Sequence, residues 1–323
     1  MNRNENHPKR LYTETYALAK FAEMALTSII TVNYNQPAAT LALLTSIKNN
    51  LNTAELEVII VDNGSLEDEG DAFTRCYPDV VYIRSAKNLG FAGGNNLGIR
   101  SAKGEYILML NNDTEVVKGM VEVMINEMFT HPEIGIISPL ILYFDQPDLI
   151  QYAGFTPMNY ATCRNRTVGL LEKNNEQYSQ ISSETSFCHG AAMMCRAADI
   201  KVAGLMPEIY FLYYEELDWC EMFRKVGKKI WFTGKTHIFH KESLSVGRES
   251  ALKAYFVARN RILFIRRNAN LFNKILFGLY FSCIAAPKQV LLYIAQKRTD
   301  LLPHFHKAIV WNFRQSKTVL PPS

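Results

Sequence analysis

Cysteine is scarce in this sequence, and its distribution excludes two classes of protein. The six cysteines are scattered over 323 residues without a CxxC pair. A secreted disulfide scaffold and a structural zinc site both need closely spaced cysteines. We therefore expect a reduced, cytoplasmic protein without a zinc site.

Two nucleotide-binding fingerprints are also missing. The glycine-rich segment 88–96 matches neither GxGxxG nor GxxxxGK[ST]. The first pattern binds the pyrophosphate of a dinucleotide, and the second cradles the phosphates of ATP or GTP. Their absence disfavours dehydrogenases and P-loop ATPases.

Long hydrophobic runs are absent as well. Residues 1–25 are polar, mix both charges and contain no apolar core typical of a secretory signal, so we expect a short N-terminal extension. The apolar stretch 275–286 extends for only twelve residues before Pro287 interrupts it. A membrane-spanning helix needs about 20 such residues, and we therefore expect no transmembrane segment.

Acidic residues become few beyond Glu249, whereas Lys and Arg continue. This asymmetry indicates an anionic partner for residues 249–323, and we expect a membrane surface rather than nucleic acid. Arg259 to Arg267 surround the apolar run 262–265, a pattern typical of helices that lie in a membrane interface. We expect the protein at the inner face of the cell membrane, and a soluble catalytic domain after truncation at Ser250. Helices that merely cover that domain are the alternative.

The sequence otherwise has the composition of a globular protein, with 48% hydrophobic and 20% charged residues. Apolar, Ile- and Val-rich runs predict buried parallel strands, and helical patterns over 37–48 and 94–102 separate them. This alternation predicts βαβ units and a Rossmann-like α/β half. The predicted strands of this half are 26–32, 56–61, 80–84 and 105–110.

A second half begins near residue 116, and the two halves together define a predicted catalytic domain over 26–248. A helix is predicted over 215–226, ended by Gly227. The polar stretch 159–186 is long for a loop without structure of its own, so we expect it to fold over a bound substrate. The predicted strands of this half are 134–138, 189–195, 229–232 and 236–239.

Polar clusters follow the ends of three predicted strands, at 33–35, 62–65 and 111–113. The carboxyl ends of parallel strands form the ligand crevice of an open sheet, so this arrangement predicts a nucleotide site. Asp113 offers a hard oxygen ligand for a cation that bridges a diphosphate. Asp62 can accept from a base or a ribose. Both are also common turn residues, and that interpretation stays open.

The segment 88–96 reads as a glycine-rich turn that opens a helix. Free amide groups and the helix dipole attract anions there, which fits a donor phosphate. A plain loop and helix start is the alternative.

Three carboxylates, Glu215, Glu216 and Asp218, crowd a predicted helix start. Crowding raises the pKa of carboxylates, which suits a base that deprotonates an acceptor hydroxyl. Acids that complement the helix dipole are the alternative. His240, at the end of an apolar strand, is either a metal ligand or a satisfied core histidine.

Taken in order, these clusters resemble the family 2 glycosyltransferases, specifically the rhamnosyltransferase-like branch that builds surface polysaccharides. The resemblance extends from about Leu26 to Gly247. It rests on the segments 28–35, 61–65, 88–96, 110–114 and 214–218, followed by His240. Each segment alone is weak evidence for the family, whereas all of them in this order are specific to it.

The resemblance implies an α/β, A-type glycosyltransferase fold, an inverting reaction, a nucleotide-diphosphate sugar donor and a saccharide or lipid-linked acceptor. It assigns Asp113 and His240 to a divalent metal, Mg²⁺ or Mn²⁺, and Glu216 or its neighbour Glu215 to the catalytic base. The residues assigned to the nucleotide sugar are Thr31, Val32, Asn33, Asp62, Asn88, Gly93, Gly94, Asn95 and Asn112. Those on the acceptor side are His189, Gly190, Asp218 and Trp219.

The sequence departs from the family pattern at two positions. Glu216 stands where the family usually has the Asp of a Glu-Asp pair, which leaves the choice between Glu215 and Glu216 open. Asn111 replaces the first acid of an Asp-x-Asp metal motif, which weakens the case for tight metal binding. A nucleotidyltransferase and a catalytically silent assembly protein on the same fold are the alternative functions.

Overall fold

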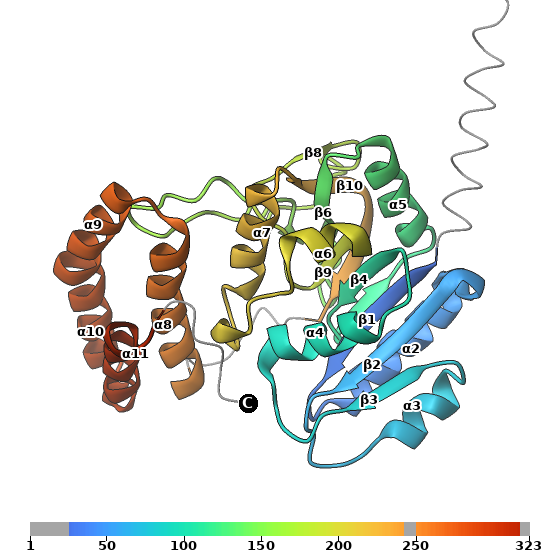
Figure 1. Cartoon of the computed structure of the whole chain (residues 1–323), viewed down its shortest axis with the longest axis horizontal. Helices are drawn as coiled ribbons and strands as arrows, with labels where there is room; N and C mark the ends of the chain where they lie inside the picture. The colour runs from blue at the N-terminus through green and yellow to red at the C-terminus, as the bar shows by residue number, and fades with distance from the viewer. Residues whose placement is uncertain (1–25, 242–249, 317–323) are drawn as a thin grey trace, which may run out of the picture.

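The computed structural model describes residues 26–241 and 250–316. The predicted N-terminal extension, 1–25, lies outside the described residues. Ten strands form one mixed sheet in the order β3-β2-β1-β4-β9-β6-β10-β5, and β7 and β8 pair with β6 and β10 beside this path (Figure 1). The strands are β1 (Thr27–Asn33), β2 (Leu56–Asp62), β3 (Val81–Arg84), β4 (Tyr106–Leu110), β5 (Thr114–Val116), β6 (Ile134–Tyr143), β7 (Ile150–Tyr152), β8 (Ser182–Glu184), β9 (Ala192–Arg196) and β10 (Lys229–His240).

Helices cover both faces of this sheet. Because strand side chains alternate between faces, Ile29 and Ile60 join the core under α2, α3 and α5, whereas Ile30 and Ile59 join the core under α4, α6 and α7. The helices of these layers are α2 (Pro37–Asn50), α3 (Gly70–Cys76), α4 (Gly90–Ser101), α5 (Met120–Thr130), α6 (Ala197–Ala203) and α7 (Glu215–Lys225). A short 3-10 turn, η2 (Glu208–Tyr210), precedes α7.

The parallel register brings the predicted polar clusters to one edge. Asn33 at the end of β1 pairs with Asp62 at the end of β2. Strand β4 runs parallel to β1 on its other side and ends just before Asn111. The clusters therefore share the carboxyl edge of the sheet, as the sequence predicts.

Three expectations for the second half change. The predicted strands 229–232 and 236–239 are one strand, β10, with an irregularity in its pairing to β6 between Thr233 and His237. The predicted strand 189–195 begins only at Ala192. The stretch 159–186 is not a free loop, because it contains β8 and its Thr162 carbonyl accepts from Arg261 of the C-terminal helices (2.6 Å).

The C-terminal helices pack beside α7 at one end of the molecule (Figure 1). They are α8 (Ala251–Asn268), α9 (Leu271–Tyr280), the π-helical turn η3 (Phe281–Ala285), α10 (Ala286–Ala295) and α11 (Leu302–Arg314), with the 3-10 turn η4 (Thr299–Leu301) before α11. Helices α8 and α11 pack closely against each other.

Pro287 does not interrupt the apolar helix, contrary to the expectation from the sequence. It occupies the first turn of α10, and α9, η3 and α10 form one continuous helix, Leu271–Ala295. The wide π turn before Pro287 accommodates a residue that cannot donate an amide hydrogen bond. By length and composition this helix could cross a membrane, a criterion that core helices of soluble proteins also meet. The expectation that no segment is long enough is therefore wrong.

Candidate active site

A cavity of about 400 Å³ opens at the carboxyl edge of the sheet, between the ends of β1 and β4 and the start of α4. Its volume falls within the usual range of small-molecule sites. Aromatic side chains form part of its wall. The lining residues are Val32, Tyr34, Asn63, Asn88, Gly90, Phe91, Asn95, Leu110, Asn111, Asn112, Asp113, Phe211, Leu212 and Leu252.

The structure divides the predicted donor residues into two groups. Val32, Asn88, Asn95 and Asn112 line the cavity together with Asp113. The remaining predicted donor residues do not line it; these are Thr31, Asn33, Asp62, Gly93 and Gly94.

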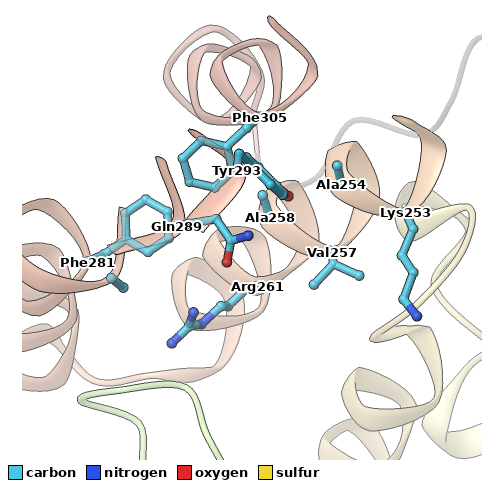
Figure 2. A pocket seen from close by; sticks show the side chains of 10 residues that line it. Lys253, Ala254, Val257, Ala258, Arg261, Phe281, Gln289, Tyr293 and Phe305 are labelled. Carbon is cyan, nitrogen blue, oxygen red and sulfur yellow. The ribbon is translucent and has the colours of Figure 1, made fainter. Parts of the chain in front are cut away.

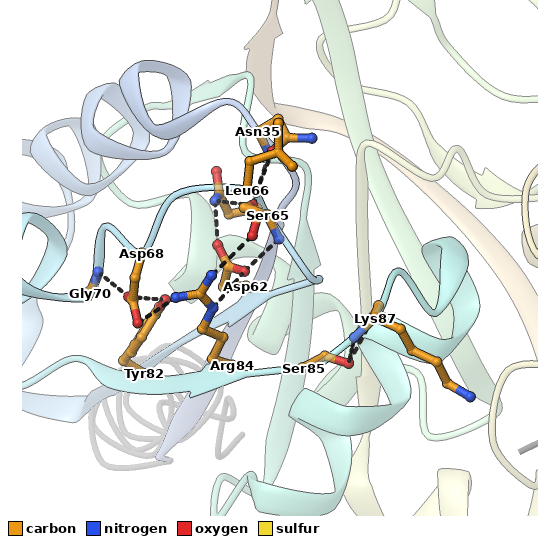
Figure 3. A network of polar contacts seen from close by, with 11 residues as sticks. Asn35, Asp62, Ser65, Leu66, Asp68, Gly70, Tyr82, Arg84, Ser85 and Lys87 are labelled. Carbon is orange, nitrogen blue, oxygen red and sulfur yellow. Dashed lines mark hydrogen bonds and ion pairs between the residues drawn. The ribbon is translucent and has the colours of Figure 1, made fainter.

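The buried Asp62 belongs to a network of polar contacts that includes Ser65 and Arg84 (Figure 3). Its carboxylate accepts from the Ser65 amide (2.9 Å) and from the Asn33 side chain (3.0 Å), and Arg84 Nε lies 3.9 Å away. Asp62 and Asn33 are fully buried, so they fix the ends of β1 and β2 rather than line the cavity. Thr31 is also fully buried, and its hydroxyl finds no hydrogen-bond partner within the described chain.

Gly93, Gly94 and Asn95 lie inside helix α4, not in a turn before it, because the helix already begins at Gly90. A Cβ on Gly94 would come within 2.9 Å of Val32 Cγ1, so glycine lets α4 pack closely onto β1. Gly93 and Gly94 therefore position the helix, and Asn95 faces the cavity.

Asp113 and His240 meet at the far end of the cavity, joining the ends of β4 and β10. Asp113 Oδ1 lies 3.1 Å from His240 Nε2. His240 Nδ1 lies 2.9 Å from Gln151 Oε1, which orients the ring so that Nε2 faces Asp113. Burial raises the pKa of Asp113, but the hydrogen bond and charge of His240 outweigh it and lower that pKa overall.

These two side chains fit a divalent cation. Asp113 Oδ1 is buried and, apart from the ion pair with His240, has no hydrogen-bond partner in the part of the chain that the structure describes. A carboxylate oxygen and a neutral imidazole nitrogen both ligate Mn²⁺ or Mg²⁺ readily. Among residues 26–241 and 250–316, no group of three or more Asp, Glu, His or Cys is arranged so that it could hold a metal ion. Further ligands would therefore come from the substrate phosphates or from water.

Glu215 and Glu216 begin helix α7, immediately after residues that contribute to the cavity wall. Burial raises the pKa of Glu216 to about 7. Burial and the neighbouring charge of Glu216 raise the pKa of Glu215 well above its ordinary value. Glu215 is 3% exposed, and its Oε2 is without a hydrogen-bond partner in the described residues. The raised pKa of Glu215 favours its protonated form, and a pKa near 7 suits Glu216 to accept a proton.

Asp218 and Trp219, which the sequence predicts on the acceptor side, point into the core. Asp218 is fully buried, forms an ion pair with Arg267 and accepts from Asn268 (2.7 Å). Trp219 is also fully buried and donates from its indole nitrogen to the Gly204 carbonyl (2.9 Å). The helical period places both side chains on the buried face of α7, together with Glu215.

His189 lies beside His240, and Gly190 lies beside the cavity wall at Phe91. The His189 ring packs edge-on against His240 at 6.0 Å, and burial, together with the charge of His240, lowers the pKa of His189 to about 3. Gly190 faces the ring of Phe91, which lines the cavity. Both residues border the site, but these contacts are apolar and do not identify them as acceptor-binding residues.

Sequence reasoning missed several residues of the site. Tyr34, Phe91 and Leu212 line the cavity, and Leu252 reaches it from the C-terminal helix α8. No periodicity or motif marks Leu252, because its role depends on how α8 folds back.

A second, smaller cavity lies within the C-terminal helices (Figure 2). It has a volume of about 100 Å³, is lined by Arg261, Gln289 and Tyr293 among others, and shares no lining residue with the first. This volume is too small for a nucleotide sugar.

Comparison with known proteins identifies the family. Residues 28–202, more than half of the chain, match the family described as Glycosyl transferase family 2. The chain is a family 2 glycosyltransferase. This glycosyltransferase is 29% identical over 244 residues to the low-salt glycan biosynthesis hexosyltransferase Agl10 of Haloferax volcanii, covering 73% of this chain and 74% of the relative.

Two further proteins support the family and the fold. The N-acetylglucosaminyl-diphospho-decaprenol L-rhamnosyltransferase of Mycobacterium tuberculosis is 22% identical over 222 residues, covering 61% of this chain and 70% of the relative. The crystal structure of GalNAc-T7 with UDP, GalNAc and Mn²⁺ superposes with a TM-score of 0.58 at 15% identity. That match covers 81% of this chain and 57% of GalNAc-T7, little more than half its length. The predicted A-type glycosyltransferase fold is confirmed, and the rhamnosyltransferase among the relatives is consistent with the predicted branch.

Proposed function

We propose that this glycosyltransferase moves a hexose or deoxyhexose from a nucleotide-diphosphate donor to a saccharide hydroxyl, with inversion at the anomeric carbon. The observation that carries this proposal is a pair of chemically different acids, Asp113 in the cavity lining and Glu216 four residues after the lining residue Leu212. Asp113 has a lowered pKa and faces His240, whereas Glu216 has a pKa raised to about 7 and follows the cavity wall at Leu212. An inverting transfer needs a site for diphosphate charge and a separate base.

The donor would lie along the carboxyl edge of β1 and β4. Tyr34 and Phe91 offer apolar surface to a base or a sugar, and the Asn88, Asn95 and Asn112 amides offer hydrogen bonds. The named relatives act as a hexosyltransferase and a rhamnosyltransferase, which supports dTDP-rhamnose or a UDP-hexose as the donor.

Asp113 and His240 would hold a divalent cation, and GalNAc-T7 was crystallised with Mn²⁺. Such a cation offsets the charge that develops on the departing diphosphate. Glu216 takes the proton of the acceptor hydroxyl while the acceptor oxygen attacks the anomeric carbon from the face opposite the diphosphate. The C1–O bond to the acceptor forms, the C1–O bond to the diphosphate breaks, and the configuration inverts.

The acceptor would be a lipid-linked saccharide at the inner face of the cell membrane. The name of the Mycobacterium relative specifies a decaprenol-diphosphate-linked acceptor. After Glu249 the chain carries twelve Lys and Arg residues and one acid, Asp300. This charge complements an anionic lipid surface.

The surface that would contact lipid differs from the one that the sequence suggests. Arg259, Arg261, Arg266 and Arg267 point into the protein, where they donate to carbonyls or bond Asn312 and Asp218. The apolar helix α9–η3–α10 instead exposes a row of large side chains at 38–74% of their surface. These are Leu271, Phe272, Ile275, Leu279, Ile284, Leu291, Leu292 and Ile294. One buried face and one apolar exposed face suit a helix that lies in the interface.

A thermal-stability screen of nucleotide sugars with and without Mn²⁺ tests the proposed donor and cation together. A ligand bound by the native state alone raises its stability by mass action. We expect a metal-dependent rise with one nucleotide diphosphate sugar, followed by release of that nucleotide during transfer. A catalytically silent protein would bind the donor without releasing the nucleotide, and a nucleotidyltransferase would instead consume a nucleoside triphosphate and a sugar phosphate.

A further inference from the structure

The side chain of Asn260 holds the loop that precedes the two glutamates. Asn260 lies in the middle of α8 and is fully buried. Its amide nitrogen lies within hydrogen-bond distance of the carbonyls of Tyr210 (2.9 Å), Leu212 (2.7 Å) and Tyr213 (2.8 Å). The two amide hydrogens of one side chain are thus shared among three loop carbonyls, of which that of Tyr210 also accepts from the Leu212 amide.

Arg259, the preceding residue, holds the beginning of the same loop. Its guanidinium donates to the carbonyls of Ile209 (2.8 Å) and Tyr210 (2.5 Å) and packs on the ring of Phe256. Phe256 in turn stacks on Phe211. Helix α8 therefore binds the loop through two adjacent polar side chains and one aromatic pair.

The loop needs this support because its backbone is strained. Phe211, Tyr213 and Tyr214 have φ values of 64°, 69° and 76°. Bulky residues rarely adopt this left-handed region, and they keep it only where the surroundings impose it. Such a loop would relax if its hydrogen-bond donors were removed.

The loop also joins the donor cavity to the proposed base. Phe211 and Leu212 line the cavity, and the Phe211 carbonyl accepts from the Phe91 amide at the start of α4 (2.8 Å). A Cβ on Gly90 would lie 2.2 Å from that carbonyl, so only glycine permits this approach. The other end of the loop continues directly into Glu215 and Glu216.

We propose that Asn260 is a positioning residue, which fixes the strained loop 210–214 and thereby sets the distance between Glu216 and the donor. The inference rests on the proposed function, because it takes Glu216 as the base. The C-terminal helices are then part of the catalytic machinery and more than a cover for the catalytic domain. A base displaced by about 1 Å can lose about 10²-fold in rate, so small relaxations of this loop matter.

The experiment compares Asn260→Ala with Asn312→Ala in the full chain. Asn312 is a matched control, because it is a buried asparagine of the same helical bundle, 6% exposed, that donates to the carbonyls of Arg259 (2.9 Å) and Ala308 (3.1 Å). Both variants lose buried hydrogen bonds, but only Asn260→Ala frees the loop. Urea denaturation establishes that each variant is folded under assay conditions.

We expect Asn260→Ala to lower kcat roughly 10- to 100-fold with the KM for the donor changed less than about threefold, since the base moves and the donor site stays. Asn312→Ala should retain kcat within about twofold. Hydrogen exchange should become faster in the peptide that covers 209–217 in Asn260→Ala and not in Asn312→Ala. The acidic limb of the pH–rate profile should also move to lower pH, because a loosened loop hydrates Glu216.

Equal losses of kcat in the two variants, or unchanged exchange over 209–217 in Asn260→Ala, would overturn the positioning role. Failure of the proposed function looks different. In that case the wild-type chain transfers no sugar, and Glu216→Gln changes nothing. The exchange measurement needs no turnover and decides by itself whether Asn260 holds the loop.

Discussion

Asp113 and His240 form an ion pair of 3.1 Å that joins the end of β4 to the end of β10. Residues distant in the sequence thus meet at one end of the donor cavity. His240 is oriented from behind by Gln151, 2.9 Å from its Nδ1. A second partner that fixes the tautomer is a common feature of metal-ligating histidines.

We predict that Asp113→Ala abolishes transfer and weakens Mn²⁺-dependent donor binding, because the strand-end motif loses its only carboxylate. Nucleotide affinity measured with and without Mn²⁺ checks this prediction. Asp145→Ala, an exposed acid in the loop after β6, is the control and should keep both activities. Full turnover in Asp113→Ala would remove Asp113 from the site.

We predict that Glu216→Gln keeps donor affinity and lowers kcat by roughly 10²- to 10⁴-fold, the range for a lost general base. Glu215→Gln should cost much less, because burial favours the protonated form of Glu215 and glutamine resembles that form. Steady-state kinetics of the two variants compare them. A larger loss in Glu215→Gln would reverse the assignment.

The pKa of Glu215 also predicts how stability depends on pH. Its folded-state pKa is raised well above the ordinary value by burial and by Glu216. The unfolded chain therefore releases this proton at lower pH than the folded chain, and stability falls as pH rises above the ordinary glutamate pKa. Glu215→Gln should then raise Tm more at pH 8 than at pH 5. A gain that does not depend on pH would contradict the neutral state of Glu215.

The sequence predicts the donor side of this enzyme better than its acceptor side. Hydrophobic periodicity predicts β1, β2 and β4, and parallel pairing then brings the residues after Asn33, Asp62 and Leu110 to one edge. It does not reveal that Asp62 turns inward to Ser65, because that depends on the local turn.

The acceptor side depends on contacts between distant segments. Trp219 follows the acids closely in the sequence, yet one helical turn directs it to Gly204 and the core. The sequence indicates a surface charge at Arg267, whereas in the fold α8 packs so that Arg267 pairs with Asp218. No pattern within α8 predicts that Asn260 satisfies the carbonyls of the loop before α7.

We predict that Asp218→Ala lowers the stability of the enzyme by about 3–5 kcal/mol, because it leaves Arg267 uncompensated at a largely buried position. The KM for the acceptor should change little in the folded variant, since Asp218 does not face the cleft. Urea denaturation and acceptor titration measure the two effects separately. A selective rise in the acceptor KM at unchanged stability would return Asp218 to the acceptor site.

The last prediction concerns the apolar row on α9–η3–α10. The double variant Ile275→Glu and Leu279→Glu places two charges in a face that is 55% and 61% exposed at these positions, so the fold should tolerate them. We expect wild-type protein to float with vesicles that contain anionic lipid, and to float less at high salt. The double variant should lose at least about tenfold in bound fraction, since each buried methylene contributes about 0.8 kcal/mol to membrane binding. Leu66→Glu, an 87% exposed leucine on the opposite half, is the control and should float like wild type.

This experiment uses the full chain, although the sequence predicts a soluble catalytic domain after truncation at Ser250. Removal of α8 would strip Asp218 of Arg267 and would free the carbonyls that Asn260 satisfies. Flotation of the double variant at the wild-type level would exclude α9–η3–α10 as the lipid-binding surface. Resistance of the wild-type protein to alkaline extraction would show a spanning helix instead, because a helix that lies in the interface is released when the lipid contacts of its basic residues are neutralised.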